Sequence, residues 1–281
     1  MRYLRCIGLF TVALLTVFVM AAVASPGGTR IDFSSLDRNQ PLKASGTLYL
    51  PENSSTPCPA VVVVHGTTGI DSRGEFYRES ILHAGIAVFE VDFKTGIYTS
   101  ASDRPQNETF LPLAFAALKE LRQLPSIDPA RIGIMGFSLG GGVTVRTAME
   151  ANRKLWMGAE KGFAAHAAFY PVCKYFIPKL EKSGSGLTGA PMIIFYGTED
   201  SYGEGSAVPE LKSLLSKKYK FEVTTVEYPG CSHGFNRNGP TVSYRDPAAI
   251  GGKGFMAWDP EAANDSLARV VAFLRQTLAA K

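Results

Sequence analysis

The segment Gly136-Phe137-Ser138-Leu139-Gly140 has the residue types and spacing that present a serine as a nucleophile. The preceding residues 131–135 are apolar and typical of a strand, and the following residues 141–149 can form a helix. A sharp turn from strand to helix lifts the serine hydroxyl clear of the sheet, and the flanking glycines let the backbone segments approach closely. A serine in a glycine-rich turn often has no further role, but this context favours nucleophilic chemistry.

A serine hydroxyl is a weak nucleophile unless a base takes its proton, and the chain offers four histidines for that task. His233 lies in a loop after the last predicted strand and is the only histidine downstream of Ser138 in such a loop. His65 ends a buried strand and is expected to hold the next loop in shape, whereas His83 lies in a helix and His166 inside a strand. We therefore predict that His233 is the base.

The acid that orients this base should lie between the serine and the histidine in the chain. A strand predicted at 191–196 is followed by two adjacent carboxylates, and we expect Asp200, with Glu199 as its competitor. Asp246 and Asp259 are distant alternatives, more simply interpreted as a turn residue and a helix cap.

Backbone amides near the serine are expected to hold the negative oxygen that forms when a carbonyl is attacked. The amide of Leu139 lies at the start of a helix, where N–H groups have no partner inside the helix. The second expected donor is the amide of Thr67, in the loop after the buried strand 60–64, where Gly66 lets the backbone turn. Each such donor contributes about 3–4 kcal/mol of transition-state stabilisation.

Strand and helix patterns alternate along the chain, which indicates a mostly parallel sheet covered on both faces in one α/β domain. The predicted helices lie at 75–84, 109–124, 141–149 and 209–219, with a last helix starting at Asp259-Pro260. The predicted strands lie at 44–50, 60–64, 86–91, 131–135, 163–170, 191–196 and 221–228.

The composition is that of a globular enzyme, with 46% hydrophobic and 19% charged residues. The net charge of +4 is scattered, and no block of Lys and Arg follows the first few residues. We therefore expect no nucleic-acid partner. The expected chemistry of a serine, a histidine and an aspartate needs neither a metal nor an organic cofactor, and no cluster of metal-ligating residues is apparent.

The first residues resemble an export signal. Arg2 and Arg5 precede an apolar run from 7 to 23, and Ala22-Val23-Ala24 provides small residues for cleavage. We expect a signal peptide at 1–24, cleavage near Ala24, and a single exported domain at 25–281, periplasmic or secreted. A retained anchor helix is the alternative, because the run approaches membrane-spanning length; after cleavage no stable membrane span is expected.

Three cysteines remain after the signal segment, namely Cys58, Cys173 and Cys231. Export would permit a disulfide. Cys173 and Cys231 both follow predicted strands, so we expect a bridge between them, with Cys58 at the other end of the sheet. The alternative is that all three are buried, unbonded small residues.

The chain resembles an α/β-hydrolase, and more narrowly the dienelactone hydrolase family, from about Leu42 to Leu278. The resemblance implies a mostly parallel eight-stranded sheet covered by helices on both faces, and the Gly-x-x-Asp spacing typical of the family favours Asp200. It rests on residues 128–141 around the serine, on Phe169-Tyr170-Pro171, on Gly197-Thr198-Glu199-Asp200 and on His233-Gly234-Phe235.

Two departures from that family bear on the substrate. Dienelactone hydrolases proper carry a cysteine where this chain has Ser138, and a glutamate where it has Gly66. The resemblance therefore implies a serine esterase on the same frame, and not hydrolysis of dienelactone itself.

The expected function is that of an exported serine hydrolase that cleaves a small carboxylic ester or lactone through an acyl-enzyme. One alternative is a non-catalytic binding protein on the same fold; another is a small peptidase, although such peptidases usually carry a large added domain. The segment 236–258, with aromatic residues and Gly251-Gly252-Lys253-Gly254, is either a lid or an ordinary surface loop.

Overall fold

The computed structural model describes residues 27–52, 57–100, 103–105 and 107–279. The predicted signal peptide and its cleavage site near Ala24 lie outside these residues. Within the described ranges, no helix combines the length and apolarity needed to cross a lipid bilayer.

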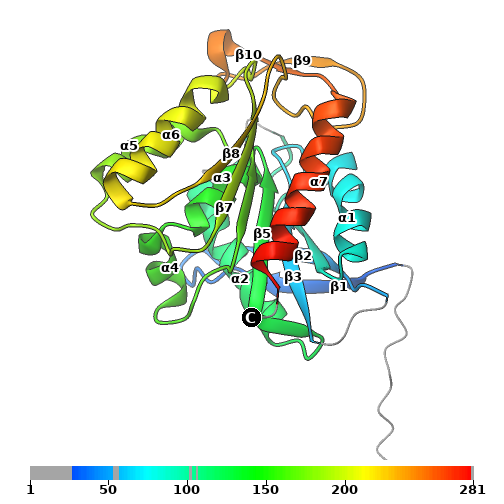
Figure 1. Cartoon of the computed structure of the whole chain (residues 1–281). Coiled ribbons are helices and arrows are strands. Elements are labelled where there is room, and N and C mark those ends of the chain that lie inside the picture. The colour runs from blue at the N-terminus through cyan, green and yellow to red at the C-terminus, as the bar shows by residue number, and fades with distance from the viewer. Residues whose placement is uncertain (1–26, 53–56, 101–102, 106, 280–281) are drawn as a thin grey trace, which may run out of the picture.

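A single large sheet runs through the centre of the fold (Figure 1), in the strand order β1-β2-β4-β3-β5-β6-β7-β8. β2 is antiparallel to both of its neighbours, and every other neighbouring pair is parallel. The expected mostly parallel sheet of eight strands is thereby confirmed. The strands are β1 (Thr29–Ser34), β2 (Lys43–Tyr49), β3 (Cys58–Val64), β4 (Ala87–Asp92), β5 (Ile127–Phe137), β6 (His166–Phe169), β7 (Met192–Gly197) and β8 (Thr224–Tyr228).

Helices cover both faces of the sheet, as the alternating pattern predicts (Figure 1). α1 (Ser72–His83) and α7 (Pro260–Thr277) pack on one face, and their buried side chains share one apolar cluster. The opposite face carries α2 (Leu111–Arg122), α3 (Leu139–Thr147) and α6 (Glu204–Tyr219), with the shorter α4 (Glu150–Met157) and α5 (Ile177–Lys182) beside them.

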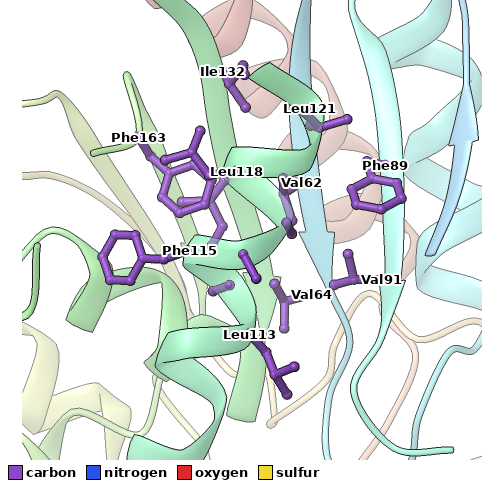
Figure 2. Packing of buried hydrophobic residues seen from close by; sticks show 14 of the residues in the cluster. Val62, Val64, Phe89, Val91, Leu113, Phe115, Leu118, Leu121, Ile132 and Phe163 are labelled. Carbon is purple, nitrogen blue, oxygen red and sulfur yellow. The ribbon is translucent and has the colours of Figure 1, made fainter. Parts of the chain in front are cut away.

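The valine run of β3 shows why the central strands are apolar throughout. Successive side chains of a strand point to opposite faces, so Val62 and Val64 contact the α2 side while Val61 and Val63 contact the α1 and α7 side. Figure 2 shows Val62 and Val64 beside α2, near its residues Leu113, Leu118 and Leu121. A strand buried on both faces holds its carboxyl end rigidly, and that end leads into the loop expected to bind the oxyanion.

Element boundaries differ from the sequence-based expectations in a few places. β1 was not among the individually predicted strands, although it completes the expected eight. The sequence predicts that α6 starts near Pro209, but the helix begins at Glu204 and continues through Pro209. Gly203, at φ 86°, turns the chain into the helix at this earlier point. The last helix begins as predicted, with Asp259 accepting a hydrogen bond from the backbone of Ala262.

The segment from 242 to 256 forms a two-stranded antiparallel hairpin, β9 (Val242–Arg245) and β10 (Lys253–Met256). This hairpin lies above the carboxyl ends of the parallel strands, at the top of Figure 1. Its tip, 246–252, carries the short 3-10 turn η3 (Ile250–Gly252). The sequence alone leaves open whether this region is a lid or a surface loop. It forms a hairpin that is hydrogen-bonded to the segments following β7 and β8.

The predicted disulfide between Cys173 and Cys231 is wrong. Both are buried as unbonded thiols, and they belong to apolar clusters on opposite faces of the sheet. Lying at the same end of a sheet does not bring two side chains together when the sheet itself separates them. Cys58 is buried at the start of β3, the other end of the sheet, as expected.

Candidate active site

Ser138 sits at the turn between β5 and α3 in a backbone conformation that few side chains adopt. It has φ 53° and ψ −110°, and it precedes the first helical residue, Leu139. A non-glycine residue in such a region costs on the order of 1–3 kcal/mol and persists only where the surroundings enforce it. The strain presents the serine hydroxyl at the carboxyl edge of the sheet, as the nucleophile turn requires.

The two glycines that flank Ser138 are there because of close backbone contact. A Cβ atom on Gly136 would lie 2.2 Å from the carbonyl oxygen of Gly140, and one on Gly140 would lie 2.2 Å from that of Val64. No side chain fits at either position. The start of α3 is thereby pressed against the end of β3.

The structure brings Ser138, His233 and Asp200 into one hydrogen-bonded line. The Nε2 atom of His233 lies 2.8 Å from Oγ of Ser138, and its Nδ1 atom lies 2.7 Å from Oδ2 of Asp200. His233 and Asp200 are 2% and 5% exposed, while Ser138 keeps partial access to solvent. The Asp200 carboxylate can only accept a hydrogen bond, so Nδ1 carries the ring proton and donates it to Oδ2, which leaves the lone pair of Nε2 facing the serine hydroxyl.

The second oxygen of Asp200 is fixed as well. Its Oδ1 atom accepts the backbone N–H of Tyr202 at 2.7 Å. The competing Glu199 is exposed, and its backbone N–H donates to the carbonyl of Cys231. Asp246 and Asp259 accept hydrogen bonds from the backbone of Ala248 and Ala262, the turn and cap roles expected of them.

The other histidines are placed as expected. His65 accepts the backbone N–H of Phe93 at Nε2 and donates from Nδ1 to the carbonyl of Gly66, so it holds the loop after β3 in shape. Burial lowers the pKa of His65, which keeps the ring neutral. His166 is fully buried in β6, where burial lowers its pKa to about 4, and His83 is exposed on α1.

The expected oxyanion donors lie on two adjoining segments. Leu139 is the first residue of α3, so its N–H has no partner within the helix. Thr67 lies in a tight turn closed by the hydrogen bond from Gly69 N to Gly66 O, and its carbonyl is held by the Tyr98 hydroxyl at 2.9 Å. The close packing of Gly140 on the end of β3 brings these two segments together.

A buried chain of polar side chains supports the site and was not recognised from the sequence. The guanidinium of Arg73 donates to the Asp71 carboxylate and to the Tyr170 hydroxyl, which in turn donates to Asn236. Asn236 lies three residues after His233. We call this set the buried polar chain; its members are Asp71, Arg73, Tyr170, Asn236, Tyr77 and Ser266. Arg73 is the second residue of α1, and nothing in the sequence around it indicates that its side chain is buried in such a chain.

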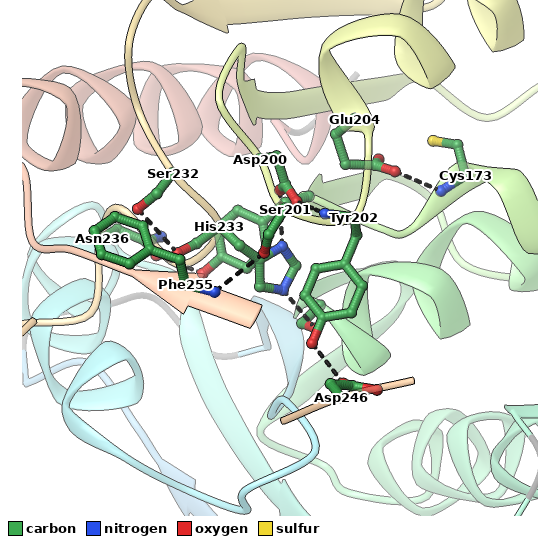
Figure 3. A network of polar contacts seen from close by, with 12 residues as sticks. Cys173, Asp200, Ser201, Tyr202, Glu204, Ser232, His233, Asn236, Asp246 and Phe255 are labelled. Carbon is green, nitrogen blue, oxygen red and sulfur yellow. Dashed lines mark hydrogen bonds and ion pairs between the residues drawn. The ribbon is translucent and has the colours of Figure 1, made fainter. Parts of the chain in front are cut away.

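A buried carboxyl group lies next to the turn at 198–203, which carries Asp200 and which we call the acid turn. Glu204, the first residue of α6, is fully buried; its Oε1 accepts the backbone N–H of Cys173 at 2.8 Å (Figure 3). Its other oxygen, Oε2, has no partner in the described part of the chain. Burial, together with the nearby negative charge of Asp200, raises the pKa of Glu204 to about 8.

Nothing in the described residues forms a cluster of three or more His, Cys, Asp or Glu side chains suited to a metal ion. The arrangement itself offers a hydroxyl aligned with an imidazole, and a carboxylate behind the imidazole.

The chain matches known proteins in sequence and in fold. A profile of the dienelactone hydrolase family matches residues 44–278. An uncharacterised protein of Mycobacterium tuberculosis is 25% identical over 197 residues, which cover 67% of each chain. Esterase FrsA of Vibrio cholerae is 28% identical over 141 residues, half of this chain but only 32% of FrsA.

Solved structures with the same fold include two hydrolases. A Thermogutta terrifontis esterase in a propionate-bound form has a TM-score of 0.65 and 20% identity, with 91% of this chain and 97% of that chain covered. The dienelactone hydrolase-like promiscuous phosphotriesterase P91, from metagenomic libraries, has a TM-score of 0.65 and 17% identity over 89% and 99% of the chains. With the profile match over most of its length, this chain belongs to the dienelactone hydrolase family, a family of α/β-hydrolase enzymes that act on ester bonds.

Proposed function

We propose that this member of the family is an exported serine esterase that cleaves a small carboxylic ester or lactone through an acyl-enzyme. The observation that carries the proposal is the aligned set of Ser138, His233 and Asp200, with contacts of 2.8 and 2.7 Å. The export signal at 1–24 and the single catalytic domain at 25–281 are part of the proposal and rest on the sequence alone.

In the proposed reaction, Nε2 of His233 takes the hydroxyl proton of Ser138 as its oxygen attacks the ester carbonyl. The amides of Leu139 and Thr67 donate to the resulting oxyanion. His233 then gives its proton to the departing alcohol, which leaves an acyl group on Ser138. A water molecule, deprotonated by the same histidine, attacks the acyl carbon. The bond from that carbon to Oγ of Ser138 then breaks, His233 returns the proton to Oγ, and the acid is released. Asp200 keeps the imidazole in the required tautomer and stabilises its charged form.

The comparisons support the ester class without specifying the substrate. FrsA and the Thermogutta protein are named as esterases, and the latter is also described as phosphorylated by paraoxon. Ser138 stands where family members proper carry a thiol, so we expect activity on simple esters rather than on dienelactone.

The test compares the wild-type protein with Ser138→Ala on short p-nitrophenyl esters. We expect kcat to fall by on the order of 10⁴ or more, because the nucleophile is lost. Labelling by paraoxon, followed by mass spectrometry of the peptide that contains Ser138, gives a second readout. An unchanged rate in Ser138→Ala refutes the assignment.

The non-catalytic binding protein is the competing function. It predicts a folded wild-type protein that neither turns over esters nor reacts with the organophosphate. A screen over acyl-chain lengths, with acidic and neutral esters, would then define the substrate class of an active enzyme.

A further inference from the structure

The imidazole of His233 is in contact with two tyrosine rings. The ring of Tyr202 lies 4.4 Å from it, centroid to centroid, and that of Tyr170 lies 4.6 Å from it. Tyr170 belongs to the buried polar chain described above. Tyr202 follows the acid by two residues and is 6% exposed, and its ring forms part of the immediate environment of the histidine.

Tyr202 contacts both partners of the hydrogen bond between acid and base. Its backbone N–H donates to Oδ1 of Asp200 at 2.7 Å, while its ring packs on the imidazole that binds Oδ2 of the same carboxylate. A displacement of Tyr202 would therefore move the Asp200 carboxylate, and it would also remove a ring that packs against the His233 imidazole.

The hydroxyl of Tyr202 reaches out of the acid turn to the β9–β10 hairpin (Figure 3). It donates to Oδ2 of Asp246 at 2.6 Å and lies 3.1 Å from the hydroxyl of Tyr244. Because Tyr202 has one hydroxyl proton and gives it to Asp246, Tyr244 is the donor in the second contact. Burial, with these two neighbours, raises the pKa of Tyr202 well above its ordinary value, so the hydroxyl keeps its proton.

Further hydrogen bonds join the hairpin to the acid turn and to the loop at 229–235, which carries His233 and which we call the histidine loop. The backbone N–H of Ile250 donates to the carbonyl of Ser201 at 2.8 Å, and that of Phe255 donates to the Ser201 hydroxyl at 3.2 Å. Directly after β10, the N–H of Ala257 donates to the Ser232 hydroxyl at 2.9 Å. The hairpin thus bridges the two loops that carry Asp200 and His233.

We propose that Tyr202 is a positioning residue that couples the seating of the β9–β10 hairpin, through Asp246, to the orientation of the Asp200–His233 pair. The inference rests on the proposed esterase function. It predicts that loss of the Tyr202 hydroxyl lowers kcat, because the imidazole is held less well in the transition state, and leaves KM nearly unchanged.

The test uses Tyr202→Phe, which keeps the ring and the backbone donor and removes only the hydroxyl. With a p-nitrophenyl ester we expect kcat to fall about 10-fold, since small displacements of catalytic groups are costly, and KM to stay within about 2-fold. Asp246→Ala, which removes the acceptor of this hydrogen bond, should lower kcat by a similar factor. The double variant should be no slower than the slower single variant, because both changes remove the same hydrogen bond.

The matched control is Tyr228→Phe. Tyr228 also donates to a carboxylate, Oδ2 of Asp265 at 2.9 Å, but this pair joins β8 to α7 away from the hairpin. We expect a small loss of thermal stability in both Tyr→Phe variants and a loss of kcat in Tyr202→Phe alone.

A spectroscopic readout separates failure of this inference from failure of the proposed function. The Nδ1 proton shared between His233 and Asp200 should give a downfield proton NMR signal in the wild type, whether or not a test ester is cleaved. The inference expects this signal to weaken or move in Tyr202→Phe and to persist in Tyr228→Phe. The proposal is overturned if the signal and kcat of Tyr202→Phe match those of Tyr228→Phe, or if the Tyr202 and Asp246 effects multiply.

Discussion

Replacement of Asp200 by asparagine gives the sharpest test of the acid, because both oxygens of this carboxylate are already committed. Oδ1 accepts the backbone N–H of Tyr202 at 2.7 Å, and Oδ2 faces Nδ1 of His233 at 2.7 Å. An asparagine amide has one accepting oxygen and one donating nitrogen. The Tyr202 N–H requires the oxygen, so the NH₂ group must face the imidazole.

That orientation reverses the tautomer of His233. Nδ1 must then accept a hydrogen bond, and the ring proton moves to Nε2, the atom that lies 2.8 Å from Ser138 Oγ. The base now presents a proton to the serine where it should present a lone pair. We expect kcat in Asp200→Asn to fall about 10⁴-fold, equivalent to about 5.5 kcal/mol of transition-state stabilisation, with KM within about 3-fold.

The assay is steady-state hydrolysis of p-nitrophenyl acetate at neutral pH, with Glu199→Gln as the matched control. Glu199 is the adjacent carboxylate, its side chain is exposed, and its backbone contact to Cys231 survives the change. We expect Glu199→Gln to retain the wild-type rate within about 2-fold. A wild-type rate in Asp200→Asn, or a large loss in Glu199→Gln, would refute the tautomer argument and the choice of acid.

Two further predictions concern stability. Ser138→Gly should be more stable than Ser138→Ala by about 1 kcal/mol, because glycine relieves the backbone strain at φ 53° that alanine retains. Thermal melting of the two inactive variants measures this difference, and equal melting temperatures would contradict it. For Glu204, burial raises the folded-state pKa to about 8 from 4.5, so the protonated group favours folding at low pH and that contribution is lost as pH rises between these values. Glu204→Gln, whose oxygen can still accept from Cys173, should therefore lose less stability than the wild type between pH 5 and 8.5, measured by denaturant unfolding; identical pH profiles would count against the prediction.

The parts of the site that were predicted from sequence are those set by local chain geometry. The turn at Ser138 needs glycine at Gly136 for its contact with Gly140, and at Gly140 for its contact with Val64 at the end of β3. Both glycines fall within one five-residue motif, which is why the turn is visible in the sequence. The order of Asp200 and His233 followed from the strands that precede them. Parallel strands end at one edge of the sheet, and loops that follow them must meet there.

The parts that were missed or wrong depend on contacts between segments distant in the chain. The contact of Tyr202 with Asp246 spans 44 residues and exists only because the hairpin is seated on the acid turn. The Cys173–Cys231 bridge failed for a related reason. Strand ends show which edge of the sheet a residue occupies, but its face depends on the course of the following loop.

The buried polar chain connects α7, the last helix of the fold, to the loop that carries His233. Asn236 donates to Tyr77, and the Tyr77 hydroxyl meets Ser266 on α7 at 2.6 Å. Fraying of the C-terminal helix would withdraw Ser266 and leave buried polar groups without partners, at a cost of about 1–3 kcal/mol for each. We therefore expect the histidine loop and α7 to unfold locally as one cooperative unit, with amide protons of both exchanging with solvent through the same opening.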